Sequence, residues 1–246
     1  VQAPLLLFGG GVMILAVLFS LSRGGILSMV LTAILLALML PFSTRGKTKF
    51  FMMFGVLILG YVLLLGIDTI VTRFDTISDS GGTRLNVYRY SLPMLMDHWL
   101  TGIGMGSFYL LSPIYLKGFP ETIQFWRVHN EYLELFLELG VPMAILFFSW
   151  IFSGLLVLVV RLRRALHHSR ADLVGGAIAA ACLCGLLGFL FHGLADFGWR
   201  LPVNLVYAVT LLAIAISCLY PAETQVTTPE LPETKRGLFP VSLIEE

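Results

Sequence analysis

The chain has 246 residues and a formal net charge of +1, with 57% hydrophobic and 13% charged residues. A soluble domain carries about 25% charged residues, so no water-soluble globule could hide this much apolar surface, and lipid must be the solvent. The near-zero net charge provides no overall basic field, which argues against nucleic acid as a partner.

Six apolar stretches follow one another along the chain, at residues 5–21, 26–42, 50–67, 141–160, 174–195 and 201–220. Each has about 17 to 22 residues, the length that crosses about 30 Å of hydrocarbon as a helix. We therefore expect an all-α, polytopic transmembrane helical bundle with about six spans, three in residues 1–67 and three in residues 129–220. The first two stretches form either a tight hairpin, which we favour, or one broken element.

Neither the start of the chain nor its cysteines indicate a functional site. The chain begins at Val1, without methionine and close to an apolar run, so we expect it to be a piece of a longer protein. It shows no signal-peptide pattern. The cysteines lie inside apolar runs, and we interpret them as small hydrophobic residues rather than disulfide partners or metal ligands: Cys182, Cys184 and Cys218.

Basic residues predict the orientation of the spans. They gather in two links, after the second stretch (Arg45, Lys47, Lys49) and after the fourth (Arg161, Arg163, Arg164, Arg170). Such links face the cytoplasm, so both termini should lie inside, including a disordered tail at residues 221–246. Residues 22–25, the large loop at residues 68–128 and the turn at residues 196–200 then lie outside.

The loop at residues 68–128 should contain helical structure. After a turn-rich stretch at residues 78–83, residues 84–99 form an amphipathic helix that we expect on the membrane surface, with one apolar face: Leu85, Tyr88, Leu92, Leu95 and Met96. No strand precedes the glycines that follow, so they indicate close packing rather than a dinucleotide site: Gly102, Gly104 and Gly106. An aromatic-rich run comes next: Tyr109, Tyr115, Phe119, Phe125 and Trp126.

Residues 129–139 predict a helix that leads into the fourth span, with a kink at Gly140 and Pro142. The spacing of Glu131, Glu134 and Glu138 puts them on one face, which should point to water or protein. His129 then lies at the outer end of this helix.

Three arginines are candidates for binding an anion. Arg23 lies on the outer side, against the usual bias of positive charge. It either snorkels to lipid headgroups or forms an anion site with Gly24 and Gly25, whose backbone N–H groups are accessible. For Arg84 a solvated face and an anion site are equally plausible, because Thr83 would cap the helix and leave Arg84 in its first turn. For Arg89 we favour a solvated face.

His129 and Asn130 lie at the membrane boundary without a second histidine or cysteine at metal-ligand spacing. His129 is either an interfacial residue with a hydrogen bond or a general base, for which a near-neutral pKa is suited. His192 and Asp196 stand four apart near the outer end of the fifth span. They either pair to stabilise the fold or line the same cavity. We expect no metal site and no cofactor.

Several short motifs occur in a fixed order: Ser22-Arg-Gly-Gly, Gly82-Thr-Arg-Leu-Asn-Val-Tyr, Asp97-His-Trp-Leu-Thr-Gly-Ile-Gly, His129-Asn130 with Gly140 after ten intervening residues, and Phe191-His-Gly-Leu-Ala-Asp. In this order and topology, from about residue 20 to residue 202, the chain resembles the O-antigen ligase and O-antigen polymerase-like membrane protein family.

The resemblance implies a metal-independent, inverting glycosyl transfer on the periplasmic face of the bacterial inner membrane. The donor would be a glycan on undecaprenyl pyrophosphate, and the acceptor would be lipid A core, another glycan or a protein hydroxyl. Arg23 and Arg84, with Arg89 as a further candidate, would bind the pyrophosphate. His129 would be the base, and Asn130, His192 and Asp196 would support the site.

The chain departs from the family pattern in two ways. Family members usually carry roughly double the number of spans, which favours the interpretation that this is a carboxy-terminal part. The family's arginine is followed by leucine four positions later, whereas Arg84 is followed there by Tyr88 and Arg89 has Leu92 three positions later. The choice between these arginines therefore stays open.

Alternatives of the same family and of another class remain beside the ligase. A polymerase or a protein O-oligosaccharyltransferase would use the same donor. A transporter or flippase would line a path with intramembrane charges, but the charged candidates here gather at the outer interface, which favours a surface reaction. An inactive scaffold is the third possibility.

Overall fold

The computed structural model describes residues 2–20, 22–40, 77–120, 123–168 and 173–220, with isolated positions between 46 and 60. The regular secondary structure of these residues is helical, and no strand occurs among them. The elements in chain order are α1 (Gln2–Phe19), α2 (Arg23–Met39), α5 (Ile77–Asp97), α6 (Phe108–Tyr115), α7 (Glu131–Leu139), α8 (Val141–His168), α9 (Leu173–His192), the 3₁₀ turn η2 (Gly198–Arg200) and α10 (Pro202–Leu219).

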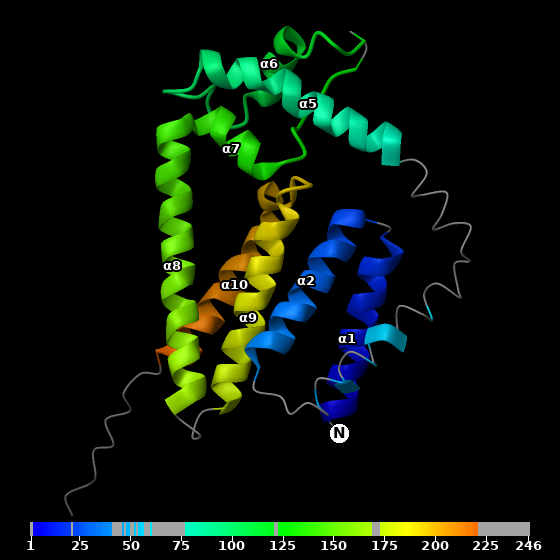
Figure 1. Ribbon diagram of the computed structural model, residues 1–246, viewed down its shortest axis with the longest axis vertical. Coiled ribbons are helices and arrows are strands. Elements are labelled where there is room, and N and C mark those ends of the chain that lie inside the picture. The colour runs from blue at the N-terminus through cyan, green and yellow to red at the C-terminus, as the bar shows by residue number, and fades with distance from the viewer. Residues whose placement is uncertain are drawn as a thin grey trace, which may run out of the picture.

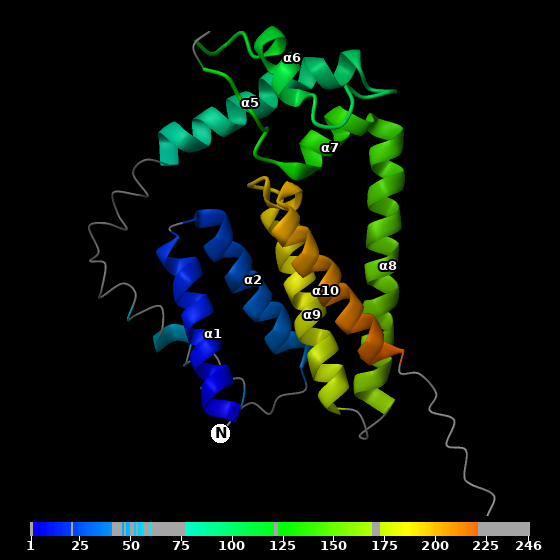
Figure 2. The same ribbon diagram turned by 180° about the vertical axis from the view of Figure 1, so that it is seen from behind.

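The helices form a bundle and a cap. α1, α2, α8, α9 and α10 run alongside one another, and α5, α6 and α7 lie across one end of them (Figures 1 and 2). α9 is the central helix and packs against α2, α8 and α10. Its buried small residues, Ala179 and Ala180, let neighbouring helices approach closely, as in membrane bundles.

Among the described residues, three helices are long and apolar enough to cross a membrane, at Val141–Leu166, Val174–His192 and Pro202–Leu219. They correspond to the fourth, fifth and sixth predicted spans. The first two predicted spans, at residues 5–21 and 26–42, correspond to shorter apolar helices, Phe8–Phe19 and Arg23–Met39. The predicted span at residues 50–67 and the predicted tail at residues 221–246 lie outside the described residues, apart from isolated positions.

The predicted outer turns at residues 22–25 and 196–200 lie at one end of the bundle, and the helix ends that flank the link after the fourth predicted span lie at the other (Figure 1). The end of α1, the start of α2 and the η2 turn lie at the cap end, whereas the end of α8 and the start of α9 lie at the opposite end (Figure 1). The first two apolar stretches form the tight hairpin that the sequence favours, because Ser22 caps α2 by accepting a hydrogen bond from the Gly25 amide. Which end faces the periplasm stays a prediction.

α5 corrects two details of the sequence analysis. It begins at Ile77, so residues 78–83 are helical rather than a turn, and Thr83 is not an N-cap. Glycine in a helix costs only about 1 kcal/mol relative to alanine, and the packing of Val87 and Met94 in the cap core outweighs such a penalty. Leu85, Leu92 and Met96 of the predicted apolar face are exposed, and the contact of this face with the membrane surface stays a prediction.

The glycines of the cap permit a close approach between two chain segments. Gly102 has φ +67°, and a side chain there would overlap the Glu138 carbonyl oxygen. Gly104 N donates to Glu138 O at 3.0 Å, and Val141 N donates to Trp99 O at 2.7 Å. At Gly140, where φ is +75°, α7 ends and α8 begins, so the predicted kink is a complete break between two helices.

Candidate active site

Segments from four parts of the chain meet at the cap end of the bundle. They are the end of α9 with the following turn at residues 193–200, residues 128–130 before α7, and the adjoining parts of α2 and α5. The described structure therefore brings together most of the residues that the sequence singled out: Arg23, Arg84, His129, Asn130, His192 and Asp196.

His129 is held in an unusual backbone conformation. Its φ of 61° lies in the left-handed region, where non-glycine residues are uncommon. Its carbonyl oxygen accepts a hydrogen bond of 2.9 Å from the Tyr88 hydroxyl. Asn130 follows as the N-cap of α7, with its side chain accepting from the Leu133 amide at 3.0 Å. These contacts fix the backbone on both sides of the imidazole.

Asp196 faces the His129 ring. His129 Nδ1 lies 3.5 Å from Asp196 Oδ1, within ion-pair distance but longer than a well-formed hydrogen bond. The edge of the Phe197 ring packs against the imidazole at a centroid distance of 5.1 Å. The side chains of His129 and Asp196 are 36% and 32% exposed, so a substrate can reach them.

Asp196 is poised to remain ionised. The contact with His129 is the main cause that lowers the pKa of Asp196; burial opposes it, and the Phe197 amide and the charges of His192 and His129 lower it further. A carboxylate beside Nδ1 favours the imidazole tautomer that leaves Nε2 as the proton acceptor. His192 Nε2 lies 3.9 Å from the other carboxylate oxygen, so the predicted proximity of His192 and Asp196 is present, although α9 ends at His192 and Asp196 lies in the turn beyond it.

Arg84 and the start of α2 both contact the turn beside Asp196. Arg84 Nη1 donates to the Ala195 carbonyl oxygen at 2.8 Å. Arg23 is the first residue of α2, and a side chain on the next residue, Gly24, would lie 3.2 Å from His192 Nδ1 and 3.4 Å from the Ala195 side chain. The glycine therefore lets the N-terminus of α2, where backbone N–H groups attract anions, reach the site.

Arg89 does not belong to this group of residues. It is exposed, and it lies about 140° around α5 from Arg84, since successive helical residues are about 100° apart. The one-turn neighbour of Arg84 is Tyr88 instead. Burial is the main cause that raises the pKa of Tyr88, while Arg84 and Asn130 lower it and Asp196 raises it, so this phenol stays protonated and can donate to His129.

A buried network of charges adjoins the site, and the sequence analysis missed it. Glu131, Glu134 and Glu138 are at most 1% exposed. Arg200 contacts all three, with Nε 3.1 Å from Glu131 and 3.5 Å from Glu134, and Nη2 2.8 Å from Glu138. Arg127 pairs with Glu134 at 3.0 Å. The shared face of α7 therefore points to protein, one of the two options that the spacing left open.

Each glutamate also accepts a hydrogen bond from the backbone of another segment. Glu131 accepts from the Trp199 amide at 2.9 Å, Glu134 from the Val128 amide at 3.0 Å, and Glu138 from the Gly106 amide at 2.8 Å. The network thus joins α7 to the glycine-rich loop, to the segment before His129 and to the turn after Asp196. Three glutamates on one face were a visible signal, but nothing in their spacing identified Arg200 as the partner.

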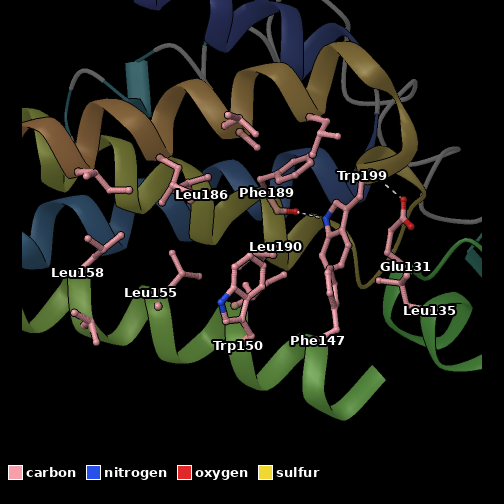
Figure 3. A pocket seen from close by; sticks show the side chains of 18 of the residues that line it. Glu131, Leu135, Phe147, Trp150, Leu155, Leu158, Leu186, Phe189, Leu190 and Trp199 are labelled. Carbon is pink, nitrogen blue, oxygen red and sulfur yellow. Dashed lines mark hydrogen bonds between the residues drawn. The ribbon is translucent and has the colours of Figure 1, made fainter. Parts of the chain in front are cut away.

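An apolar groove of about 1010 Å³ lies between α8 and the α9–α10 pair. Figure 3 shows Trp150, Leu155 and Leu158 of α8 facing Leu186, Phe189 and Leu190 of α9 across it. Glu131 and Trp199 lie at one end, and Glu131 and Arg200 are the charged residues of the described lining. Its walls suit hydrocarbon better than a glycan.

In the part of the chain that the structure describes, no group of three or more His, Cys, Asp or Glu side chains is arranged to hold a metal ion. Whether glycosyl transfer by this protein proceeds without a metal ion is a property of the reaction, and the metal-independent mechanism stays a prediction.

The family profile described as O-antigen ligase matches residues 8–148, which is more than half of the chain. The chain belongs to the O-antigen ligase family. Membership confirms the resemblance seen in the motifs and indicates a membrane glycosyltransferase-like function, with a lipid-linked glycan and an acceptor as substrates in general terms. No curated protein matches the chain, and no solved structure does.

The matched region contains the three candidate arginines, His129 and Asn130. His192 and Asp196 lie beyond residue 148, so their place in the site depends on the fold alone.

Proposed function

We propose that this O-antigen ligase family protein transfers a glycan from undecaprenyl pyrophosphate to an acceptor hydroxyl, as a ligase would, on the periplasmic face of the inner membrane. The observation that carries the proposal is the meeting of a histidine–carboxylate pair, His129 and Asp196, with two arginine-bearing elements at one end of an apolar bundle. Each part of the site has a role in that reaction.

His129 would act as the general base. Its Nε2 would take the proton of the acceptor hydroxyl as that oxygen attacks the anomeric carbon of the donor sugar. Asp196 would stabilise the imidazolium that forms, as the carboxylate does in other histidine–carboxylate pairs. A positioned base is worth about 10²- to 10⁴-fold in rate.

The arginines would act on the leaving group. As the bond between the anomeric carbon and the pyrophosphate oxygen breaks, the pyrophosphate takes the electron pair and its negative charge grows. Guanidinium groups and helix N-terminal amides placed beforehand stabilise such charge without reorganisation. Arg84, Arg23 and the start of α2 would supply these groups, because Arg84 binds the Ala195 carbonyl oxygen and Gly24 lies close enough to Ala195 that an added side chain would touch it.

The apolar groove supports a lipid-linked donor. It ends at Glu131 and Trp199, which are two residues from His129 and three from Asp196 in the sequence. We assign it to the hydrocarbon chain of the carrier, since its lining resembles the interior of the bilayer. A transporter or flippase would instead need a polar path, and the groove walls described here offer none beyond Glu131 and Arg200.

The assay that tests the proposal uses purified full-length protein, an undecaprenyl-pyrophosphate-linked glycan and a lipid A core acceptor, with and without chelator. Arg84→Lys keeps the charge but loses the planar fork, so we expect transfer to fall by about 10- to 100-fold, since hydrogen bonds to charged groups are worth about 1.5–3 kcal/mol. Arg89→Lys is the matched control on another face of α5 and should transfer at the parental rate.

The assay also has clear failures. Parental rates in both Arg84→Lys and Arg23→Ala would remove the arginines from the site, and loss of activity in chelator would rule out a metal-free reaction. The acceptor is tested in a deletion strain. Uncapped lipid A core with long polymer retained on the carrier indicates a ligase, whereas single repeats on the core indicate a polymerase. Loss of a protein-linked glycan with capped core intact indicates a protein O-oligosaccharyltransferase.

A further inference from the structure

The buried charge network holds more carboxylates than cations. Glu131, Glu134 and Glu138 carry three acidic groups, and Arg200 and Arg127 carry two basic ones. Replacing such a network by apolar side chains is often neutral or stabilising, because burying ions costs free energy. The network is therefore a weak source of stability. The way in which it holds neighbouring segments in place is a separate matter.

Arg200 is the member that connects two segments of the site. Asp196 and Arg200 lie in the same short turn, residues 193–200, and are four residues apart. Arg200 binds Glu131, Glu134 and Glu138 of α7, while the Trp199 amide donates to Glu131. The turn is fixed from its other end too, because the Glu131 amide donates to the Gly193 carbonyl oxygen at 2.8 Å.

The same helix fixes His129. α7 begins two residues after it, and Glu134 holds the Val128 amide immediately before it. The position of Asp196 relative to His129 is therefore set by how the turn sits on α7. The two side chains are 3.5 Å apart, so a small shift of the turn would break their contact. A misplacement of about 1 Å can cost about 10²-fold in rate.

We propose that Arg200 is a positioning residue of the site: by binding the three buried glutamates of α7 it holds the turn at residues 193–200 in the register that sets Asp196 against His129. The guanidinium suits this task because its fork reaches Glu131 and Glu138 at once, which a lysine ammonium on a single stem cannot do. This role rests on the proposed function, in which His129 and Asp196 form the base pair.

A double-mutant cycle on transfer activity tests the proposal. Arg200→Lys should lower kcat by about 10- to 100-fold with little change in the KM for the donor, as expected when the base is misplaced rather than the binding site lost. Asp196→Asn should lower kcat as well. Because Arg200 acts through Asp196, the double variant should be no slower than the slower single variant. Losses that multiply, or a change in KM alone, would overturn the proposal.

Arg127→Lys is the matched control. Arg127 contacts the same network through Glu134 but does not contact the turn at residues 193–200 in the described structure, so it should cost much less than Arg200→Lys. If Arg200→Lys does not fold, Glu138→Gln serves in its place, since it removes one of the contacts of Arg200 while lowering the excess of negative charge. In the Asp196→Asn background, Glu138→Gln should cause no further decrease in kcat. Decreases in kcat that multiply in the double variant would again overturn the proposal.

A structure of the Arg200→Lys variant, or of Glu138→Gln if the former does not fold, separates this proposal from the proposed function. We expect the turn to be displaced on α7 and the contact between Asp196 and His129 to be lost, whether or not the protein transfers a glycan. An unmoved turn overturns the positioning role and leaves the proposed function intact. A moved turn in a protein whose parent shows no transfer overturns the proposed function alone.

Discussion

His129 combines a strained backbone with a carboxylate partner. A residue held in a sparsely populated backbone region costs on the order of 1–3 kcal/mol and persists only when its surroundings fix it. Here the Tyr88 hydroxyl, the Asn130 cap and the bond from Val128 to Glu134 all hold the segment. Such strain is typical of functional sites, and it supports the choice of His129 over the other described histidines.

His129→Ala is therefore expected to reduce transfer by about 10²- to 10⁴-fold while the amount of protein in the membrane stays normal. His98→Ala is the control, because His98 lies beside Tyr115 and Asp97, away from the residues grouped around Asp196. His192 is unsuitable as a control, since it lies 3.9 Å from Asp196. Transfer at the parental rate by His129→Ala would refute its role as the base.

Glu131 and Asp196 predict opposite effects of pH on stability. Burial is the main cause that raises the pKa of Glu131 above its ordinary 4.5, with Glu134 adding to it and Arg200 and the Trp199 amide opposing it. The stability that the neutral form contributes is present below pH 4.5 and is lost as the pH rises through the higher folded pKa. Asp196 has a pKa below its ordinary 3.8, so its contribution is present above pH 3.8 and is lost as the pH falls.

Melting temperatures in detergent measure both effects. Relative to wild type, Glu131→Gln should gain stability as the pH rises above 4.5. Asp196→Asn should show the opposite change, losing stability relative to wild type as the pH rises above the lowered folded pKa of Asp196. Curves that stay parallel to wild type for both variants would contradict these assignments.

At the scale of single elements, α7 organises the cap. It is a nine-residue helix that supplies the three buried glutamates, and Leu137 from its other face packs into the cap core with Val87 and Phe108. Its end abuts the glycine-rich loop, where the Ile103 amide donates to the Leu137 carbonyl oxygen at 2.9 Å. The junction of α7, the loop and α8 depends on backbone contacts that a side chain would block.

Gly102→Ala should therefore destabilise the protein more than Gly106→Ala. Both residues have positive φ, so both substitutions introduce strain of about 1–3 kcal/mol. Only at Gly102 does the added methyl overlap the backbone, at the carbonyl of Glu138, whereas the space around Gly106 is open. Each kcal/mol lowers Tm by about 2–4 °C in a chain of this size. Equal melting temperatures would show that the packing at Gly102 is not tight.

At the scale of the whole molecule, the candidate site lies at one end of an apolar bundle. The cap covers that end, and the end of α8 and the start of α9, which flank the second basic link, lie at the opposite end (Figure 2). The exposed apolar surface of α8 and α10, which includes Trp150, Leu156 and Val206, fits contact with lipid. The orientation of this bundle decides whether the site faces the periplasm.

Single cysteines in a cysteine-free background test that orientation. Leu110→Cys on the cap and Ala165→Cys near the end of α8 both place the thiol at an exposed position. In intact spheroplasts an impermeant maleimide should label the first, and it should label the second only after lysis. Labelling of Ala165→Cys alone in intact spheroplasts would invert the assigned topology.

The sequence by itself indicated that lipid surrounds the protein, that the fold is all-α and which family the chain resembles. It also favoured a tight hairpin of the first two apolar stretches. These follow from local properties: the length and composition of the apolar runs, the short link between the first two of them, and the order of short motifs. It also identified His129, Arg84 and the pair of His192 with Asp196, since charged and polar residues are conspicuous in an apolar chain.

Only the tertiary structure decided how these residues combine. His129 and Asp196 are 67 residues apart, and no periodicity could pair them. The spacing of Glu131, Glu134 and Glu138 marked a polar face, but burial of that face against Arg200 depends on how the final turn packs on α7. Helix packing also placed Arg84 beside the turn that carries Asp196 and brought Gly24 close to His192, because these contacts join elements that are distant in the sequence.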